Sequence, residues 1–310
     1  MEQASHLARW LARWTHGEGR ASTGCGSPGC PGPSSLAARF WPKRTGAYLQ
    51  GVFYCSRRCL EAALTAQLAR LHALTPATPP ANRIPLGLLM VARGWLTHEQ
   101  VVQALAAQQR AKGGQIGDWF EKLGFASAQQ VTSALALQWG CPVTTSLDSA
   151  ASQPLDRIPL GILESLQMIP LHFEAATGTL YVAFGQRVDH AALYAIEKIV
   201  DCRTRPCVAS RRSVSEELAR LRQRPRPQEI EFGPMTDCAE IARISVSYMA
   251  RLGSEEARLG RVGSFLWLRL RTQQSHTDIV FRLKAAMPAK EAVEISVREA
   301  RARRRPASSG

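Results

Sequence analysis

The chain has 310 residues, of which 45% are hydrophobic, and a formal net charge of +14 at pH 7. This length exceeds one typical domain and indicates two or three modest ones. The sequence has no run of about eighteen or more apolar residues, which argues against a transmembrane helix. Residues 1–20 mix charged and apolar side chains and lack a signal-peptide core, so we expect a cytoplasmic protein.

Four cysteines in two close pairs follow a helix-like segment at residues 7–14, and they are Cys25, Cys30, Cys55 and Cys59. Four thiolates held in pairs on short loops are the ligand set of a closed, structural zinc site. The second pair resembles the Tyr-Cys-Ser-x-x-Cys end of treble-clef zinc knuckles. The alternatives are four reduced cysteines or, in an oxidising compartment, disulfide pairs. We predict that residues 1–75 hold structural zinc, with no catalytic role because no ligand position stays open.

A proline-containing linker at residues 75–82 leads into a segment that repeats itself thirty residues later. Each copy pairs a glycine turn with a helix whose apolar residues lie four apart, so Val101 and Leu105 share a face, as do Val131 and Leu135. The sequence therefore predicts a pseudo-twofold pair of helical hairpins over residues 82–142. Such a pair suits a partner that is itself twofold.

Each copy resembles the motif of the N-terminal domain of type II secretion and type IV pilus assembly ATPases, the GspE/MshE N-terminal domain family. The copies cover residues 85–108 and 115–138. In this family the tandem motif binds cyclic di-GMP through glycine backbone, apolar side chains and a final glutamine. The ligand-binding positions that this resemblance implies are Leu86, Gly87, Met90, Gly94, Val101, Leu105, Gln108, Gln115, Ile116, Gly117, Phe120, Gly124, Val131, Leu135 and Gln138.

The arginine that leads the family motif is absent from both copies. Pro85 stands in its place in the first copy and Gln115 in the second. Neither offers the planar, charged fork that suits guanine edges and phosphates. Arg83, Arg110 and Lys112 lie near these positions and are candidates to supply the charge. The alternative is a pair of helical hairpins in which the glycines only form turns and the apolar residues only form a core.

Residues 143–222 resemble the second part of the same family domain. The order helix, strand, strand, helix, strand, helix predicts a small α+β sandwich. Its expected helices and strands lie at residues 159–166, 168–173, 180–184, 189–199, 207–209 and 213–222. Cys202 and Cys207 have no further ligands nearby in the sequence, so we favour core or edge cysteines over a second metal pair, and we interpret Cys141 and Cys238 in the same way.

A proline-broken, charged linker at residues 222–228 precedes the C-terminal region, residues 229–290. Asp237 is the expected N-cap of an amphipathic helix over residues 238–252, which Gly253 ends. Residues 265–271 and 278–283 predict a β-hairpin. Within it Trp267 lies beside two arginines and either covers the hairpin core or stacks on a base or a partner. The whole chain is therefore expected to be an α+β protein.

Basic residues gather at residues 203–226 and in a tail at 291–310 that we expect to be flexible. Nucleic acid is not the expected partner, because these arginines lack interleaved aromatic residues and no nucleic-acid-binding motif accompanies them. The Gly-x4-Gly-Lys-Ser/Thr loop of assembly ATPases and the Gly-x-Ser-x-Gly motif are both absent from the sequence. We therefore expect no enzyme.

Together these patterns predict a non-catalytic adaptor or sensor related to the N-terminal domain of secretion and pilus assembly ATPases, with cyclic di-GMP as a possible ligand. One alternative is a ligand-free docking scaffold for a protein of a type II secretion or type IV pilus-like machinery. Another is a basic, zinc-containing nucleic-acid binder, in which the tail at residues 291–310 would carry the contact.

Overall fold

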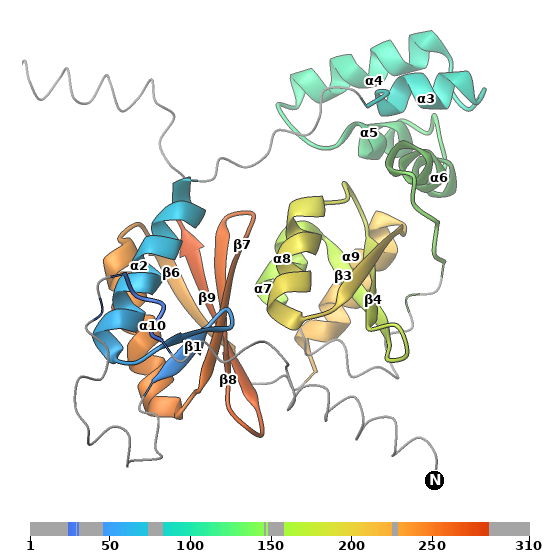
Figure 1. Ribbon diagram of the computed structural model, residues 1–310. Coiled ribbons are helices and arrows are strands. Elements are labelled where there is room, and N and C mark those ends of the chain that lie inside the picture. Colours follow the sequence, from blue (N-terminus) through green and yellow to red (C-terminus); the bar gives the residue numbers. More distant parts are fainter. Residues whose placement is uncertain are drawn as a thin grey trace, which may run out of the picture.

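The computed structural model describes residues 24–28, 30, 46–73, 83–145, 147, 158–224 and 229–284. Three predicted segments lie outside the described residues: the helix at residues 7–14, the linker at 75–82 and the basic tail at 291–310. The described strands form one six-stranded and one three-stranded sheet. In Figure 1 the larger sheet with its helices, a group of helices and the smaller sheet with its helices are seen as three units. The predicted α+β class, with a helical repeat and a C-terminal hairpin, is confirmed. No described helix has the length and apolar character needed to cross a bilayer.

The tandem repeat folds into two helical hairpins that follow the same local rules. Its helices are α3 (Leu86–Ala92), α4 (His98–Arg110), α5 (Ile116–Lys122) and α6 (Ala128–Trp139). Thr97 and Ser127 each form a capping box with the glutamine three residues on, which starts the second helix of each copy. Gly94 and Gly124 both have φ of 70°, a left-handed conformation that glycine adopts without strain.

The smaller unit is an α+β subdomain that follows the repeat. It contains α7 (Leu160–Leu166), β3 (Met168–Glu174), β4 (Thr179–Phe184), α8 (His190–Val200), β5 (Arg203–Val208) and α9 (Arg211–Arg222). Strands β3 and β4 are antiparallel, whereas β4 and β5 are parallel and are joined across α8, as a parallel pair requires. Asp189 accepts a hydrogen bond from Ala192 N and caps α8, as predicted.

The larger sheet combines strands from both ends of the described chain in the order β2-β1-β7-β8-β9-β6. Its elements are β1 (Ala47–Leu49), β2 (Val52–Tyr54), α2 (Arg57–Ala73), β6 (Glu229–Met235), α10 (Cys238–Leu252), β7 (Glu256–Val262), β8 (Phe265–Arg271) and β9 (His276–Leu283). The prediction of separate N-terminal and C-terminal units is therefore wrong for these residues. Strand β1 pairs in parallel with β7, which places residues about two hundred positions apart in one sheet.

Helices α2 and α10 cover one face of this sheet and share a core. Leu64 and Leu68 of α2 pack in the same buried cluster as Ile241 and Met249 of α10. Arg261 of β7 donates hydrogen bonds to the carbonyls of Leu71 and His72, at 2.9 and 3.1 Å, near the end of α2. These bonds satisfy carbonyls that the last turn of a helix leaves without partners.

The other face of the larger sheet packs on the α+β subdomain. Gly260 of β7 lies so close to α8 that a Cβ placed there would be 2.8 Å from Ile199 Cδ1. Strand β8 is buried on both faces, because Leu266 and Leu268 belong to the core beneath α2 and α10 whereas Trp267 belongs to the core of the α+β subdomain. Trp267 is completely buried, so the alternative in which it stacks on a base or a partner is wrong.

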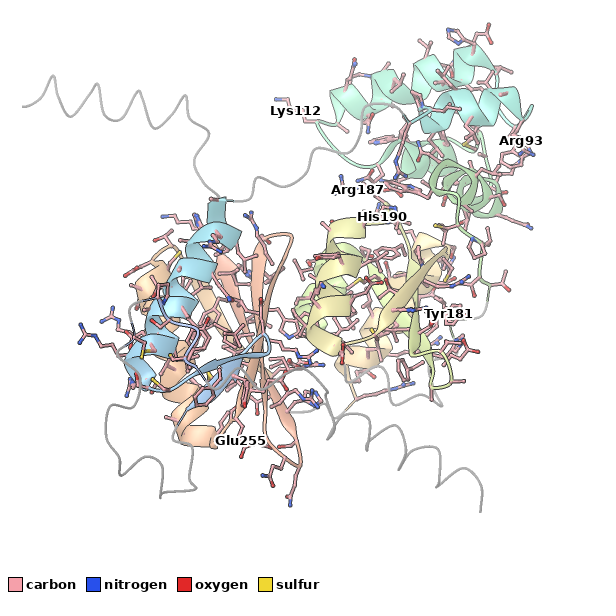
Figure 2. The ribbon with its side chains drawn as sticks, in the orientation of Figure 1. Arg93, Lys112, Tyr181, Arg187, His190 and Glu255 are labelled. Carbon is pink, nitrogen blue, oxygen red and sulfur yellow. The ribbon has the colours of Figure 1, made fainter. Side chains whose placement is uncertain are left out.

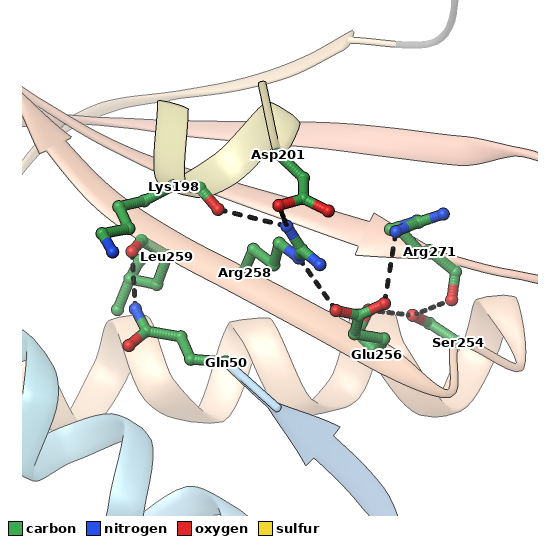
Figure 3. A network of polar contacts seen from close by, with 8 residues as sticks. All are labelled: Gln50, Lys198, Asp201, Ser254, Glu256, Arg258, Leu259 and Arg271. Carbon is green, nitrogen blue, oxygen red and sulfur yellow. Dashed lines mark hydrogen bonds and ion pairs between the residues drawn. The ribbon is translucent and has the colours of Figure 1, made fainter. Parts of the chain in front are cut away.

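A polar network joins α8 to the larger sheet (Figure 3). Arg258 Nη1 of β7 donates to the carbonyl of Lys198 at 3.3 Å and lies 3.7 Å from Asp201 Oδ1, while its Nε donates to Glu256 at 2.8 Å. Glu256 also lies 3.4 Å from Arg271 Nη1. Burial lowers the pKa of Arg271, and the charge of Glu256 opposes this effect. The network fixes the end of α8 against β7.

Candidate functional site

The two cysteine pairs come together in the folded chain. Cys25 and Cys30 lie in the loop before the larger sheet, Cys55 directly follows β2, and Cys59 lies in the first turn of α2. All four sulfur atoms lie within 4.8 Å of one another, with 3.5 Å between Cys30 and Cys55 and 3.7 Å between Cys30 and Cys59. Tetrahedral zinc with Zn–S bonds of about 2.3 Å needs sulfurs about 3.8 Å apart. The cluster therefore has the ligand set and spacing to hold one metal ion.

Backbone contacts with β2 hold the first cysteine loop in place. Gly26 N donates to the carbonyl of Phe53 at 2.8 Å, and Cys25 Sγ accepts a hydrogen bond from Cys55 N at 3.5 Å. A side chain at Gly26 would collide with Val52, so glycine permits this close approach. The second pair is therefore positioned by β2 and α2, and the first pair is positioned by its contact with β2.

The four thiols influence one another's protonation. Burial raises the pKa of the Cys25 thiol, but hydrogen bonds with the backbone of Cys55 and Ser27 and with neighbouring thiols outweigh this effect and bring the pKa to about 7. Hydrogen bonding with Cys30, followed by burial, raises the pKa of Cys55 to about 12. The cluster thus favours a thiolate at one position, and thiolate is the form that binds a metal.

Cys202 and Cys207, which the sequence favoured as core or edge cysteines over a second metal pair, do not belong to a metal-ligating group among the described residues. Within the described part of the chain, no second group of three or more metal-ligating side chains comes together. Cys207 is buried, and burial raises its pKa to about 11. Burial also raises the pKa of Cys141 and of Cys238. Cys141, Cys202 and Cys238 are half-buried and pack against the cores.

The two predicted ligand glutamines occupy equivalent positions, and each bonds to the segment that leads into the short helix of the other copy. Gln108 Nε2 donates to the carbonyl of Gly114, and Gln138 Nε2 donates to the carbonyl of Ile84, both at 2.7 Å. Each bonded carbonyl lies two residues before the short helix of the opposite copy. We call Gln138 with Ile84 and Arg83 site A, and Gln108 with Gly114 and Lys112 site B.

The other predicted ligand positions divide into core and surface. The buried ones are Leu86, Gly87, Met90, Val101, Gly117, Phe120 and Val131, and the half-buried ones are Gln108, Ile116, Leu135 and Gln138. The exposed ones are Gly94, Leu105, Gln115 and Gly124. Most of the apolar positions of the motif therefore pack inside the repeat.

A basic side chain belongs to each site. The Arg83 guanidinium lies 3.3 Å from the ring centroid of Trp139, and its Nη1 is a buried nitrogen without a hydrogen-bond partner among the described residues. Lys112 projects from the end of α4 and is exposed (Figure 2). Arg110 instead bonds to its own helix, since its Nε donates to the carbonyl of Ala106 at 3.3 Å. Pro85 and Gln115 make no side-chain cap bond at the helices that follow them.

An open hollow that the sequence did not indicate lies beside the repeat. It has a volume of about 480 Å³ and is lined by Arg93, Trp95, Ser133, Ala136, Leu137, Gly140, Cys141 and Val143. Its walls come from the turn between α3 and α4, from α6 and from the segment that follows α6. Only the fold brings these separated residues together, which is why no sequence motif marks the hollow.

The two copies differ in what covers them. In the second copy Leu135 and Ala136 pack into the core of the α+β subdomain, and Asp118 forms an ion pair with Arg211 of α9. The equivalent positions of the first copy, thirty residues earlier, are Leu88, Leu105 and Ala106, and all three are exposed. Val102 beside them is 51% exposed, whereas its counterpart Thr132 is 7% exposed. We call Leu88, Val102 and Leu105 the free face.

Comparison with known families identifies the segment after the repeat. Residues 139–228 match the MshEN domain family. The match begins at the last residue of α6 and contains the α+β subdomain. It confirms the resemblance to the GspE/MshE N-terminal domain family for this segment. The tandem repeat lies before the matched residues, so its assignment to the family depends on its own motif.

Comparison with solved structures finds similarity to MshE and to XpsE. A structure of MshE with cdg is 25% identical in sequence, and the match covers 45% of this chain and 99% of that chain with a TM-score of 0.37. A structure of the N-terminal domain of XpsE is 16% identical and covers 44% of this chain and 92% of that chain with a TM-score of 0.35. A comparison with curated proteins found no match.

Proposed function

We propose that this chain is a non-catalytic adaptor whose tandem repeat senses a cyclic dinucleotide, with cyclic di-GMP as the first candidate. The observation that carries the proposal is the pair of equivalent sites A and B, in which a glutamine of one copy bonds to the backbone of the other. The MshEN match directly after the repeat and the MshE structure with cdg support this choice of ligand.

The two glutamine bonds provide a mechanism for sensing. Each joins a neutral amide to a backbone carbonyl, and such a bond contributes only about 0.5–1.5 kcal/mol. A twofold ligand that offers two guanine edges would compete for both amides at once. Because each amide ties one copy to the other, its release would alter how the two hairpins contact each other. Ligand binding would then reach the α+β subdomain through α6.

Each site contains a basic residue that could replace the arginine missing from the motif. In site A the cation Arg83 directly precedes Ile84 in the sequence, and in site B the cation Lys112 lies two residues before Gly114. A lysine acts on phosphate as a point charge, whereas a guanidinium also offers a planar fork. The two sites are therefore chemically unequal, and we expect Arg83 to contribute more to affinity than Lys112.

Calorimetric titration of cyclic di-GMP into the full chain tests the proposal. We expect saturable binding that is lost in Gln108→Ala with Gln138→Ala, because both amides are removed. The matched control is Gln109→Ala with Gln129→Ala, which removes two exposed glutamines from the same helices. GTP and cyclic di-AMP serve as ligand controls. Absence of saturable heat with the wild-type chain, or equal loss in both double variants, would contradict the sensor proposal.

A second candidate function is a docking scaffold without a ligand, and the asymmetry between the copies favours it. The free face is apolar and exposed where the second copy is covered by its own subdomain. Arg110 lies one turn beyond Ala106 on the same helix, so the expected occupant is a protein with an apolar surface and a carboxylate at its rim. Val102→Asp with Leu105→Asp would leave the stability of the full chain unchanged and abolish such docking.

We further propose that the metal held by the cysteine cluster is zinc. Four thiolates at tetrahedral spacing suit zinc and leave no open position for water or substrate. The residues that would hold it are Cys25, Cys30, Cys55 and Cys59, and the role is structural. Elemental analysis of the purified chain tests this assignment, with one zinc per chain expected.

A further inference from the structure

The outer face of the three-stranded sheet carries two stacked aromatic rings beside two arginines. His172 of β3 and Tyr181 of β4 stack with ring centroids 4.3 Å apart and planes 14° apart. In the parallel pairing of β4 with β5, Tyr181 lies opposite Arg205 and Thr179 lies opposite Arg203. Side chains two apart on a strand share a face, so both arginines lie on the same face as the Tyr181 ring.

This face is open at one end and covered at the other. Ala183 and Cys207, the next pair along the same two strands, are 0% and 5% exposed. His172, Arg203 and Arg205 are exposed, and Tyr181 is half-buried beneath its stacking partner. Figure 2 shows Tyr181 on the side of the subdomain that faces away from the larger sheet. The rings and arginines are therefore accessible to a ligand.

The two arginines have no partner within the described part of the chain. Neither the Arg203 nor the Arg205 side chain forms an ion pair or a hydrogen bond there, whereas Arg212 nearby in sequence is paired with Glu216 at 2.8 Å. Glu174, a carboxylate at the end of β3, already accepts a hydrogen bond from Thr177 at 2.7 Å. The positive charge of Arg203 and Arg205 is thus available to an external anion.

We propose that this face binds single-stranded nucleic acid, with an unpaired base stacked on the His172–Tyr181 pair and phosphates held by Arg203 and Arg205. Base stacking on exposed aromatic side chains, combined with a basic track for the backbone, is how single strands are bound without sequence preference. The formal net charge of +14 adds long-range attraction for a polyanion. A duplex would bind less well, because its bases are already stacked.

The sequence did not indicate this face, and the expectation that nucleic acid is not a partner followed from the spacing of its basic residues. The arginines at residues 203–226 lack aromatic neighbours in the sequence, and the prediction depended on that absence. The crossover from β4 through α8 to β5 places Tyr181 next to Arg205 in the sheet. Folding therefore supplies the combination of aromatic and basic groups that the linear sequence lacks.

Fluorescence anisotropy of labelled single-stranded U20 and dT20, with a matched duplex, tests the proposal on the full chain. We expect both single strands to bind more tightly than the duplex. Tyr181→Ala with His172→Ala should weaken binding about 5- to 150-fold, the loss of one stacked base. Arg203→Gln with Arg205→Gln should reduce the salt slope by about 1.4. Tyr181→Phe keeps the ring and should bind like the wild-type chain.

The control variant removes the same charge elsewhere. Arg70 of α2 and Arg243 of α10 are exposed, so Arg70→Gln with Arg243→Gln lowers the net charge equally. No binding of either single strand by the wild-type chain would overturn the proposal. Equal weakening in both arginine double variants, or full binding by the Tyr181→Ala, His172→Ala chain with an unchanged melting temperature, would also overturn it.

Discussion

Two glycines determine how closely the helices of each copy approach one another. A Cβ placed at Gly87 would lie 2.9 Å from Val101 Cγ1, and one placed at Gly117 would lie 2.8 Å from Val131 Cγ1. Valine has few rotamers available within a helix, so it cannot turn aside. The repeat of this chain therefore requires glycine at both positions for packing, whether or not a ligand binds.

Replacing Gly87 by alanine should destabilise the repeat by about 1–3 kcal/mol through overpacking. Urea unfolding followed by helix content measures this effect, and Val101→Ala in the same chain should restore part of the loss. Gly113→Ala is the matched control, because a Cβ there meets nothing within 4 Å. Equal stability of the Gly87→Ala and Gly113→Ala chains would show that the close helix contact does not exist.

At the scale of elements, the β8–β9 hairpin contains a buried ion pair between the two cores. Arg269 Nε and Nη2 donate to the two carboxylate oxygens of Asp278 at 2.8 and 2.7 Å, and Trp267 Nε1 donates to the same carboxylate at 2.7 Å. Arg269 and Asp278 are 5% and 3% exposed. The hydrogen bonds between Arg269 and Asp278 therefore compensate two opposite charges that are buried within the sheet.

Asp278→Asn should destabilise the larger sheet by about 3–5 kcal/mol, because it leaves the Arg269 charge buried and unpaired. Thermal unfolding of the full chain measures the loss. The control is Arg212→Gln, which breaks a surface pair whose arginine side chain is 88% exposed and should cost about 0–1 kcal/mol. A cost for Asp278→Asn no larger than that of the control would contradict the buried position of the pair.

Elements with local signals in the sequence were predicted, whereas elements that depend on distant partners were not. Helix α10 has both an Asp237 cap and a left-handed Gly253 at its end, and its bounds agree with the prediction. Strand β1 has only three residues and pairs with β7 far along the chain, and β6 contains Gly233 and lies at the sheet edge. No local pattern distinguishes such strands from a loop.

The candidate sites follow the same division. The cysteine spacing indicated which four thiols come together, because each pair is local and only the two pairs had to meet. The motif positions identified Gln108 and Gln138, but not the carbonyls of Gly114 and Ile84 that accept their hydrogen bonds. The Ile84 carbonyl lies 54 residues from Gln138, so only the packing of the two hairpins reveals that bond. The Gly114 carbonyl lies six residues from Gln108, in the segment between the copies.

For the whole molecule, the cysteine cluster stabilises more than its own loop. Cys25 and Cys59 pack against the core beneath α2 and α10, and Leu49 of β1 is fully buried in it. Strand β1 pairs with β7, whose neighbours β8, β9 and β6 lie at the C-terminal end of the described chain. We therefore expect that loosening the cysteine cluster would also loosen β7.

Cys55→Ser should therefore increase hydrogen exchange in β1, α2 and β7 while α3 to α6 keep their protection. Exchange measured by mass spectrometry on the full chain compares these segments directly. Cys202→Ser is the control, because that half-buried cysteine lies outside the cluster. An increase confined to residues 24–59, with β7 unaffected, would show that the cluster stabilises only its own loop.

The most direct measurement of the sensor proposal is hydrogen exchange of the full chain with and without saturating cyclic di-GMP, in peptides that span residues 83–90 and 113–120. We predict that protection changes in both peptides together, because sites A and B are equivalent and each glutamine bonds to the opposite copy. A change in neither peptide at ligand saturation, or in one peptide alone, would contradict the account of the repeat as a twofold sensor.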